Sequence, residues 1–149
     1  MAMSAAKRAH RICVFVFVRV KETPPLQILC FNIALEKSIV NNIKQMITLT
    51  KQQSTKTHII LQAVYPINKT DRESLFDKFQ LRDRDNQTID ELNEMLESLA
   101  KEEKITFLNV NSYLMDKNKE LKKEYTFDGL HPNMQGYLAI RDAILEVLD

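Results

Sequence analysis

An aspartate and a histidine stand three residues apart near the end of the chain, in Asp128-Gly-Leu-His131-Pro-Asn. A carboxylate that hydrogen-bonds one nitrogen of an imidazole sets its tautomer, and the other nitrogen can then take a proton from a hydroxyl group. The pair is therefore suited to general acid–base chemistry. The same spacing also occurs where an aspartate caps a turn and the histidine simply lies on the surface.

The glycines of the chain favour the first of these interpretations. There are only two, Gly129 and Gly136, and both lie in or next to this segment. Average usage would give a chain of this length about ten. Glycine permits positive φ or close approach of another group, Pro132 stiffens the exit, and Asn133 is suited to begin a helix. We therefore expect a loop that holds the imidazole beside the carboxylate.

The segment Asp128-Gly-Leu-His131-Pro-Asn, followed by Gly136-Tyr137, resembles the last sequence block of the SGNH (GDSL-type) serine hydrolases, which include esterases, lipases and acylhydrolases. The runs 57–68 and 105–110 look like two of the family's buried strands. The resemblance runs from about residue 33 to the end. It implies a serine ester hydrolase that acts on small acyl esters without a cofactor, with His131 as general base and then acid, oriented by Asp128.

Other blocks of that family are missing. The family's nucleophile lies in a Gly-Asp-Ser motif near the N-terminus, whereas this chain has no glycine before Gly129 and none of its serines follows a Gly-Asp pair. Where the family has Gly-x-Asn-Asp, this chain has Cys30-Phe31-Asn32-Ile33. Asn32 is an oxyanion-hole donor, the counterpart of the family's Asp after a one-residue deletion, or simply a loop or strand-end asparagine. The alternative to an active hydrolase is therefore a catalytically inactive truncated remnant, or a non-catalytic interaction module on the same scaffold.

Strands and helices alternate along the chain, which predicts an α/β fold with a parallel sheet. The resemblance makes this a three-layer, flavodoxin-like domain, truncated at its N-terminus. We expect a single domain, 1–149, with an atypical leader over 1–31 and a hydrolase-like region over 32–149. Ligands of such sheets bind at the carboxyl ends of the strands, and the Asp128–His131 loop follows the last strand. The expected strands are 12–20, 26–31, 58–65 and 105–110.

Helical periodicity predicts three helices around these strands. The first covers 38–52. The second begins with a capping box, Thr88-x-x-Glu91. The last starts at Pro132 or Asn133 and buries one face, made of Tyr137, Ile140, Ile144, Val147 and Leu148. His58 should be a core or edge histidine, and Tyr65 either packs in the core or lines a pocket.

Composition narrows the function classes. A net charge of +1 gives no basis for nucleic-acid binding, and no apolar run reaches the length of a membrane span. Cys13 and Cys30 lie in apolar runs, as buried thiols do. We find no metal-ligand spacing. The apolar run 12–18 is closed by Arg19 without a cleavage site, which favours a strand in a cytoplasmic protein over a signal peptide.

The truncation predicts self-association or only marginal folding, because the missing strands should leave apolar surface beside the 58–65 strand. The exception would be a chain in which the 12–20 strand fills the vacant position.

Overall fold

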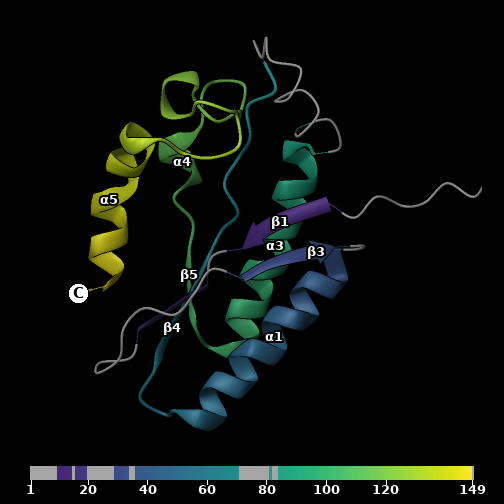
Figure 1. Ribbon diagram of the computed structural model, residues 1–149. Helices are drawn as coiled ribbons and strands as arrows, with labels where there is room; N and C mark the ends of the chain where they lie inside the picture. The colour runs from purple at the N-terminus through teal and green to yellow at the C-terminus, as the bar shows by residue number, and fades with distance from the viewer. Residues whose placement is uncertain are drawn as a thin grey trace, which may run out of the picture.

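The computed structural model describes residues 10–14, 16–19, 29–33, 36–70, 81 and 84–148. Among the described residues, strands and helices alternate from residue 29 to residue 114, as the sequence predicts, and only helices follow (Figure 1). The elements are β1 (His10–Val14), β2 (Val16–Arg19), β3 (Leu29–Ile33), α1 (Glu36–Gln53), β4 (His58–Gln62), α3 (Asn86–Glu103), β5 (Thr106–Leu108), α4 (Asn111–Leu114), a 3-10 helix (Lys123–Tyr125) and α5 (Met134–Leu148).

The described strands form a three-stranded sheet, β2-β4-β5, and a separate two-stranded sheet, β1-β3. Strands β4 and β5 are parallel, with Ile60 opposite Thr106. The expected single parallel strand over 12–20 is wrong, because β1 and β2 divide it between the two sheets. Strand β2 runs antiparallel to β4, with Val16 opposite Leu61. The position beside β4 is therefore filled, which is the exception that the sequence analysis allowed.

Helices cover both faces of the β4–β5 pair, which gives three layers (Figure 1). Successive side chains of a strand point to opposite faces. Accordingly Ile59 and Leu61 lie in a core with α1 and α3, whereas Ile60 lies in a second core with Ile140 of α5. The α1–α3 core buries these apolar side chains: Ile39, Ile43, Ile47, Ile89, Leu92, Leu96 and Leu99. The domain is therefore α/β with flanking helices, as predicted.

The N-terminus of α3 differs from the prediction. Asp85, rather than Thr88, is the N-cap residue, and its side chain accepts a hydrogen bond from the Thr88 backbone N–H. Asp85 also accepts a hydrogen bond from the Thr88 hydroxyl, at 2.8 Å. An N-cap side chain normally accepts a hydrogen bond from the backbone N–H two or three residues after it. The helix therefore begins about one turn earlier than the capping-box pattern indicates.

The final helix is predicted well except for Tyr137. Ile140 is fully buried, and Ile144, Val147 and Leu148 pack against the same core. Tyr137, by contrast, is 47% exposed. Most of the 1–31 leader lies outside the described residues. Among the described helices, none combines the length and the hydropathy that a bilayer span requires.

Candidate active site

The loop between the 3-10 helix and α5 folds around the Asp128 carboxylate. Asp128 Oδ1 accepts hydrogen bonds from the backbone N–H groups of Leu130, at 2.9 Å, and His131, at 2.8 Å. Gly129 has φ 80°, a left-handed conformation that a residue with Cβ adopts only with strain. A backbone bridge between Thr126 and Pro132 closes the loop. The local sequence thus turns the chain so that residue 131 returns to residue 128.

The expected aspartate–histidine contact is present. Asp128 Oδ2 lies 2.6 Å from His131 Nδ1. Partial burial favours a higher pKa for Asp128, but hydrogen bonds from the His131 backbone, the His131 ring and the Leu130 backbone outweigh it and lower the pKa to about 2. Asp128 is therefore ionised at neutral pH. An ionised carboxylate at Nδ1 makes Nδ1 the protonated nitrogen of a neutral imidazole, which leaves the lone pair on Nε2.

The histidine ring is open to solvent. Its side chain is 67% exposed, against 34% for Asp128. Within the described part of the chain, Nε2 of His131 has no hydrogen-bond partner. Thr126 supports the carboxylate from below: it is 5% exposed, its hydroxyl accepts from Gly129 N–H at 2.9 Å, and it lies 3.4 Å from Asp128 Oδ1. In the neutral ring, Nε2 of His131 can therefore accept a proton from a group that approaches from solvent.

Tertiary hydrogen bonds fix this loop at the carboxyl end of β4. The backbone N–H of Asn68 donates to the Gly129 carbonyl at 2.8 Å, and the Asn68 amide donates to the Leu121 carbonyl at 2.7 Å. The chain from Ala63 to Asn68 is mostly buried but forms no strand. Its backbone polar groups therefore need partners other than a neighbouring strand.

Asparagine side chains, two of them buried, provide those partners. Asn93 of α3 accepts from Val64 N–H at 2.7 Å and donates to the Val64 carbonyl at 3.0 Å. Asn111 donates to the same carbonyl at 2.9 Å. Asn86 makes the equivalent pair with the backbone of Ile67. Sequence reasoning missed these residues, although a polar Asn93 on the apolar face of α3 was a usable signal.

The start of α5 explains the second glycine. Asn133 caps the helix, since its side-chain oxygen accepts from Gln135 N–H at 2.9 Å and Gly136 N–H at 3.1 Å. Its own backbone N–H donates to the Tyr125 carbonyl at 2.7 Å. A Cβ at Gly136 would lie only 2.9 Å from that carbonyl oxygen. Gly136 thus allows α5 to begin close beside the 3-10 helix, just after His131.

The other candidates from the sequence lie elsewhere. Asn32 is in β3, opposite Arg11 of β1, in the two-stranded sheet, and its side chain lies outside what the structure describes. His58 is exposed at the start of β4, the middle strand of its sheet, and its Nε2 lies 2.9 Å from the Thr106 hydroxyl. Tyr65 packs against the α5 core and accepts a hydrogen bond from Gln62. Burial raises the pKa of Tyr65 to about 12, although the hydrogen bond from Gln62 opposes the rise.

Among the described residues, no serine is hydrogen-bonded to the Asp128–His131 pair, which we call the dyad. Ser38, Ser54, Ser98 and Ser112 are described, and none of them hydrogen-bonds to His131. Ser98 instead donates to the Glu94 carbonyl within α3, at 2.9 Å. Among described residues there is likewise no group of three or more His, Cys, Asp or Glu side chains that could hold a metal ion.

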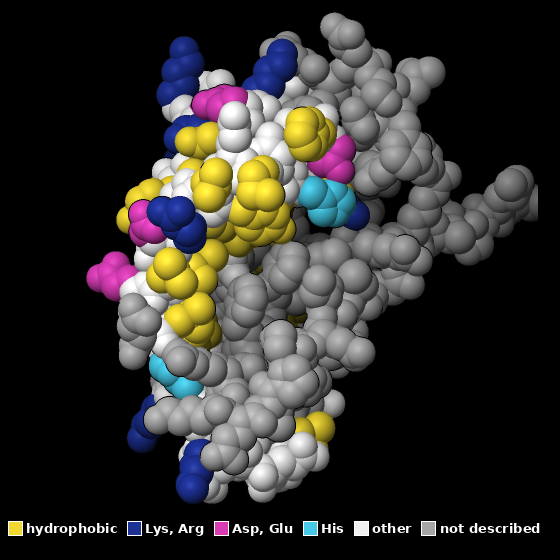
Figure 2. All heavy atoms as spheres, turned by 60° about the vertical axis from the view of Figure 1, so that its left-hand side comes forward, with side chains coloured by type: hydrophobic (Ala, Val, Ile, Leu, Met, Phe, Trp, Pro, Cys, Tyr) yellow, Lys and Arg dark blue, Asp and Glu magenta, His cyan; other side chains and the backbone are white. Residues whose placement is uncertain are grey.

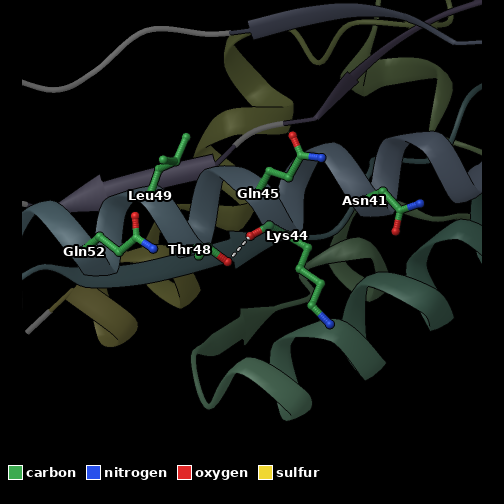
Figure 3. Close-up of a pocket in the computed structure, with 6 residues that line it drawn as sticks. All are labelled: Asn41, Lys44, Gln45, Thr48, Leu49 and Gln52. Carbon is green, nitrogen blue, oxygen red and sulfur yellow. Dashed lines mark hydrogen bonds between the residues drawn. The ribbon is translucent and has the colours of Figure 1, made fainter.

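A hollow along α1 is a separate feature. Figure 3 shows its polar lining, with the Thr48 hydroxyl donating to the Lys44 carbonyl at 2.9 Å. This helix covers the sheet face opposite α5 (Figure 1). The hollow offers amide, hydroxyl and ammonium groups but no paired acid and base. Its lining residues are Asn41, Lys44, Gln45, Thr48, Leu49 and Gln52.

Two curated proteins resemble this chain over part of their length. The isoamyl acetate-hydrolyzing esterase of Saccharomyces cerevisiae is 26% identical over 110 residues, which is 74% of this chain and 46% of the esterase. The N-acylneuraminate cytidylyltransferase of Escherichia coli O18:K1:H7 is 30% identical over 106 residues, which is 71% of this chain and 22% of that enzyme. The chain therefore spans less than half the length of either relative.

Solved structures also resemble this chain, over about half of their length. A Streptococcus pneumonia protein, provisionally assigned as a platelet activating factor, superposes with a TM-score of 0.72 at 27% identity, over 78% of this chain and 53% of its own. A GDSL-like lipase from Bacteroides thetaiotaomicron superposes with a TM-score of 0.61 at 30% identity, over 76% of this chain and 52% of the lipase. The sequence model of the GDSL-like Lipase/Acylhydrolase family matches residues 20–139. This chain therefore belongs to the GDSL-like lipase/acylhydrolase family.

Proposed function

We propose that the chain provides the acid–base half of a GDSL-type ester hydrolase, with His131 as the general base and Asp128 as the residue that orients it. The observation that carries the proposal is the 2.6 Å contact between Asp128 Oδ2 and His131 Nδ1. In the neutral imidazole this contact places the proton on Nδ1 and the lone pair on Nε2, and the ring is exposed. Family membership supports the same assignment.

The reaction follows from that geometry. A serine hydroxyl at Nε2 would give its proton to His131 while its oxygen attacks the ester carbonyl. His131 would then return the proton to the departing alcohol, leaving an acyl-serine. Water, deprotonated by the same nitrogen, would release the acid and restore the serine. Asp128 would stay ionised throughout and stabilise the transient imidazolium.

Substrate class follows from the relatives. The Saccharomyces cerevisiae relative is named for hydrolysis of isoamyl acetate, so small acyl esters such as acetates are the first class to test. Asn32 is proposed as an oxyanion donor on family resemblance alone.

A second candidate is a non-catalytic interaction module on the hydrolase scaffold. It is favoured by one specific observation: the sequence has no glycine before Gly129 and hence no Gly-Asp-Ser motif. On this reading the Asp128–His131 contact only stabilises the loop. The two candidates differ in whether His131 ever receives a proton from a nucleophile.

Two assays of p-nitrophenyl acetate hydrolysis distinguish the candidates: one with the chain alone, and one with the chain fused to a segment that supplies a serine nucleophile. Alone, the chain should be no faster than its His131→Ala variant, because Asp128 and His131 cannot form an acyl-serine without a serine beside them. Fusion to the part of the Bacteroides thetaiotaomicron lipase that this chain does not match should produce turnover. That turnover should require His131 and Asp128 and survive His58→Ala, the matched histidine control.

A folded fusion that labels with a serine-directed fluorophosphonate, yet hydrolyses ester equally well without His131, would refute the hydrolase proposal and favour the module. Turnover by the chain alone that disappears on replacing one serine would instead identify a nucleophile within it. Nitrogen-15 spectra of the His131 ring supply an independent check, since the proposal requires the proton on Nδ1.

A further inference from the structure

The outer face of α5 is apolar although it meets solvent. Met134, Leu138 and Leu145 are 73%, 52% and 48% exposed. The opposite face of the same helix buries Ile140 in the core. Figure 2, which brings the α5 side of the molecule forward, shows hydrophobic side chains gathered in a band on this face. A helix that is apolar on both faces is normally covered on both.

The exposed residues have the spacing of a helix-pairing seam. Met134, Leu138, Arg141 and Leu145 follow one another at intervals of four, three and four residues, the alternation that keeps side chains along one line between two paired helices. We call these residues the α5 seam. The Arg141 side chain is 59% exposed and its Nε lies 2.8 Å from Asp142 Oδ1, so the charge within the seam is already neutralised.

We propose that the α5 seam docks antiparallel against the α5 seam of a second copy of this chain. In that register Met134 faces Leu145 of the other copy, and Leu138 packs on the aliphatic stem of the other copy's Arg141. Each contact occurs twice, as a two-fold interface requires. Arginine stems cover apolar side chains well while their charged ends reach water.

The charges of α5 select this occupant and this direction. Its first turn holds no acidic residue and its last turn no basic one, so the helix dipole is uncompensated at both ends. Antiparallel pairing opposes the dipoles and brings Glu146, near the C-terminal end, beside the positive N-terminal end of the other α5. A lipid surface, usually negative, would meet Asp142 and Glu146 at the border of the seam.

The interface is small. A single pair of helices contributes less than the 1,200–2,000 Å² buried in stable complexes, so we expect a weak dimer with a Kd on the order of 10–100 μM.

Sedimentation of the full chain over a range of concentrations tests the proposal. We expect a monomer–dimer equilibrium, and Leu138→Glu should raise Kd at least about tenfold without changing the circular dichroism spectrum. The matched control is Leu49→Glu on α1, since Leu49 is 56% exposed but lies outside the seam; it should leave Kd unchanged. A chain that stays monomeric at about 200 μM, or a dimer insensitive to Leu138→Glu, would overturn the proposal, as would a monomer that binds phosphatidylglycerol vesicles through α5.

Cross-linking tests the register. With Cys13 and Cys30 replaced by serine, a mixture of Met134→Cys and Leu145→Cys chains should oxidise to a mixed dimer, while neither variant alone should. In the antiparallel register two copies of position 134 are about 16 Å apart along the axis, too far for a disulfide. Homodimers of Met134→Cys would indicate parallel pairing and contradict the proposal.

Discussion

Replacing Asn93 with alanine should destabilise the domain by about 2–4 kcal/mol. Val64 N–H would lose its partner, 2.7 Å away in the wild-type protein, and a buried unpaired donor costs about 1–3 kcal/mol. The space left by the amide adds about 1 kcal/mol. The Val64 carbonyl would not be orphaned, because Asn111 also donates to it. The same change should loosen the 63–68 segment that anchors the Asp128–His131 loop.

Asn93→Asp tests the hydrogen bonds of Asn93 without changing its volume, because the two side chains have nearly the same shape. A neutral acid can accept from Val64 N–H and donate to the Val64 carbonyl, whereas a carboxylate would point a lone pair at that carbonyl. Burial therefore raises the pKa of the introduced carboxyl above its unfolded value near 4. Stability should be near wild type below pH 4 and fall by about 2–3 kcal/mol as the pH rises through the folded-state pKa.

Urea unfolding followed by circular dichroism at pH 4 and pH 7 measures both effects. The control is exposed Asn41→Ala on α1, which should lie within about 0.5 kcal/mol of wild type. Amide spectra of the residues around His131 would show whether the loop moves. An Asn93→Ala variant as stable as the control, or an Asn93→Asp variant whose stability does not change with pH, would refute the role assigned to the buried amides.

Three further changes test other parts of the structure. Asp128→Asn should reduce stability at neutral pH, and its deficit relative to wild type should disappear as the pH falls from about 4 through about 2 in urea melts, because the folded-state pKa of Asp128 lies below its unfolded value; a constant deficit would contradict the ionised contact. Gly136→Ala should cost about 1–2 kcal/mol in thermal melts, since crowding against the Tyr125 carbonyl outweighs the gain of about 1 kcal/mol in helix propensity; a stabilised variant would show that the 3-10 helix can give way. Asp85→Ala should lower stability by about 1 kcal/mol, more than Thr88→Ala does, because Asp85 is the N-cap. A larger loss of stability for Thr88→Ala would instead indicate that Thr88 is the N-cap, as the capping-box pattern predicts.

Local sequence determined the candidate site. Asp128, Gly129 and His131 lie within a few residues of one another, so the turn and the carboxylate–imidazole contact depend on backbone conformations that residue types set directly. The same holds for the alternation of strands and helices, since hydrophobic periodicity reports which face of each element is buried. Family resemblance then gave the dyad its proposed chemistry.

Tertiary structure decided what depends on distant partners. The run 12–20 reads as one apolar strand, but only the pairing of Val16–Arg19 with β4 shows that it divides and runs antiparallel, because an apolar run does not encode strand direction. The Tyr125 carbonyl that excludes a side chain at Gly136 comes from another element. The amide of Asn93 meets Val64 across 29 residues of chain. The sequence shows where a polar or small residue lies along the chain. Its partner, such as a buried backbone group or a carbonyl that leaves no room for a side chain, comes from a segment that only folding brings close.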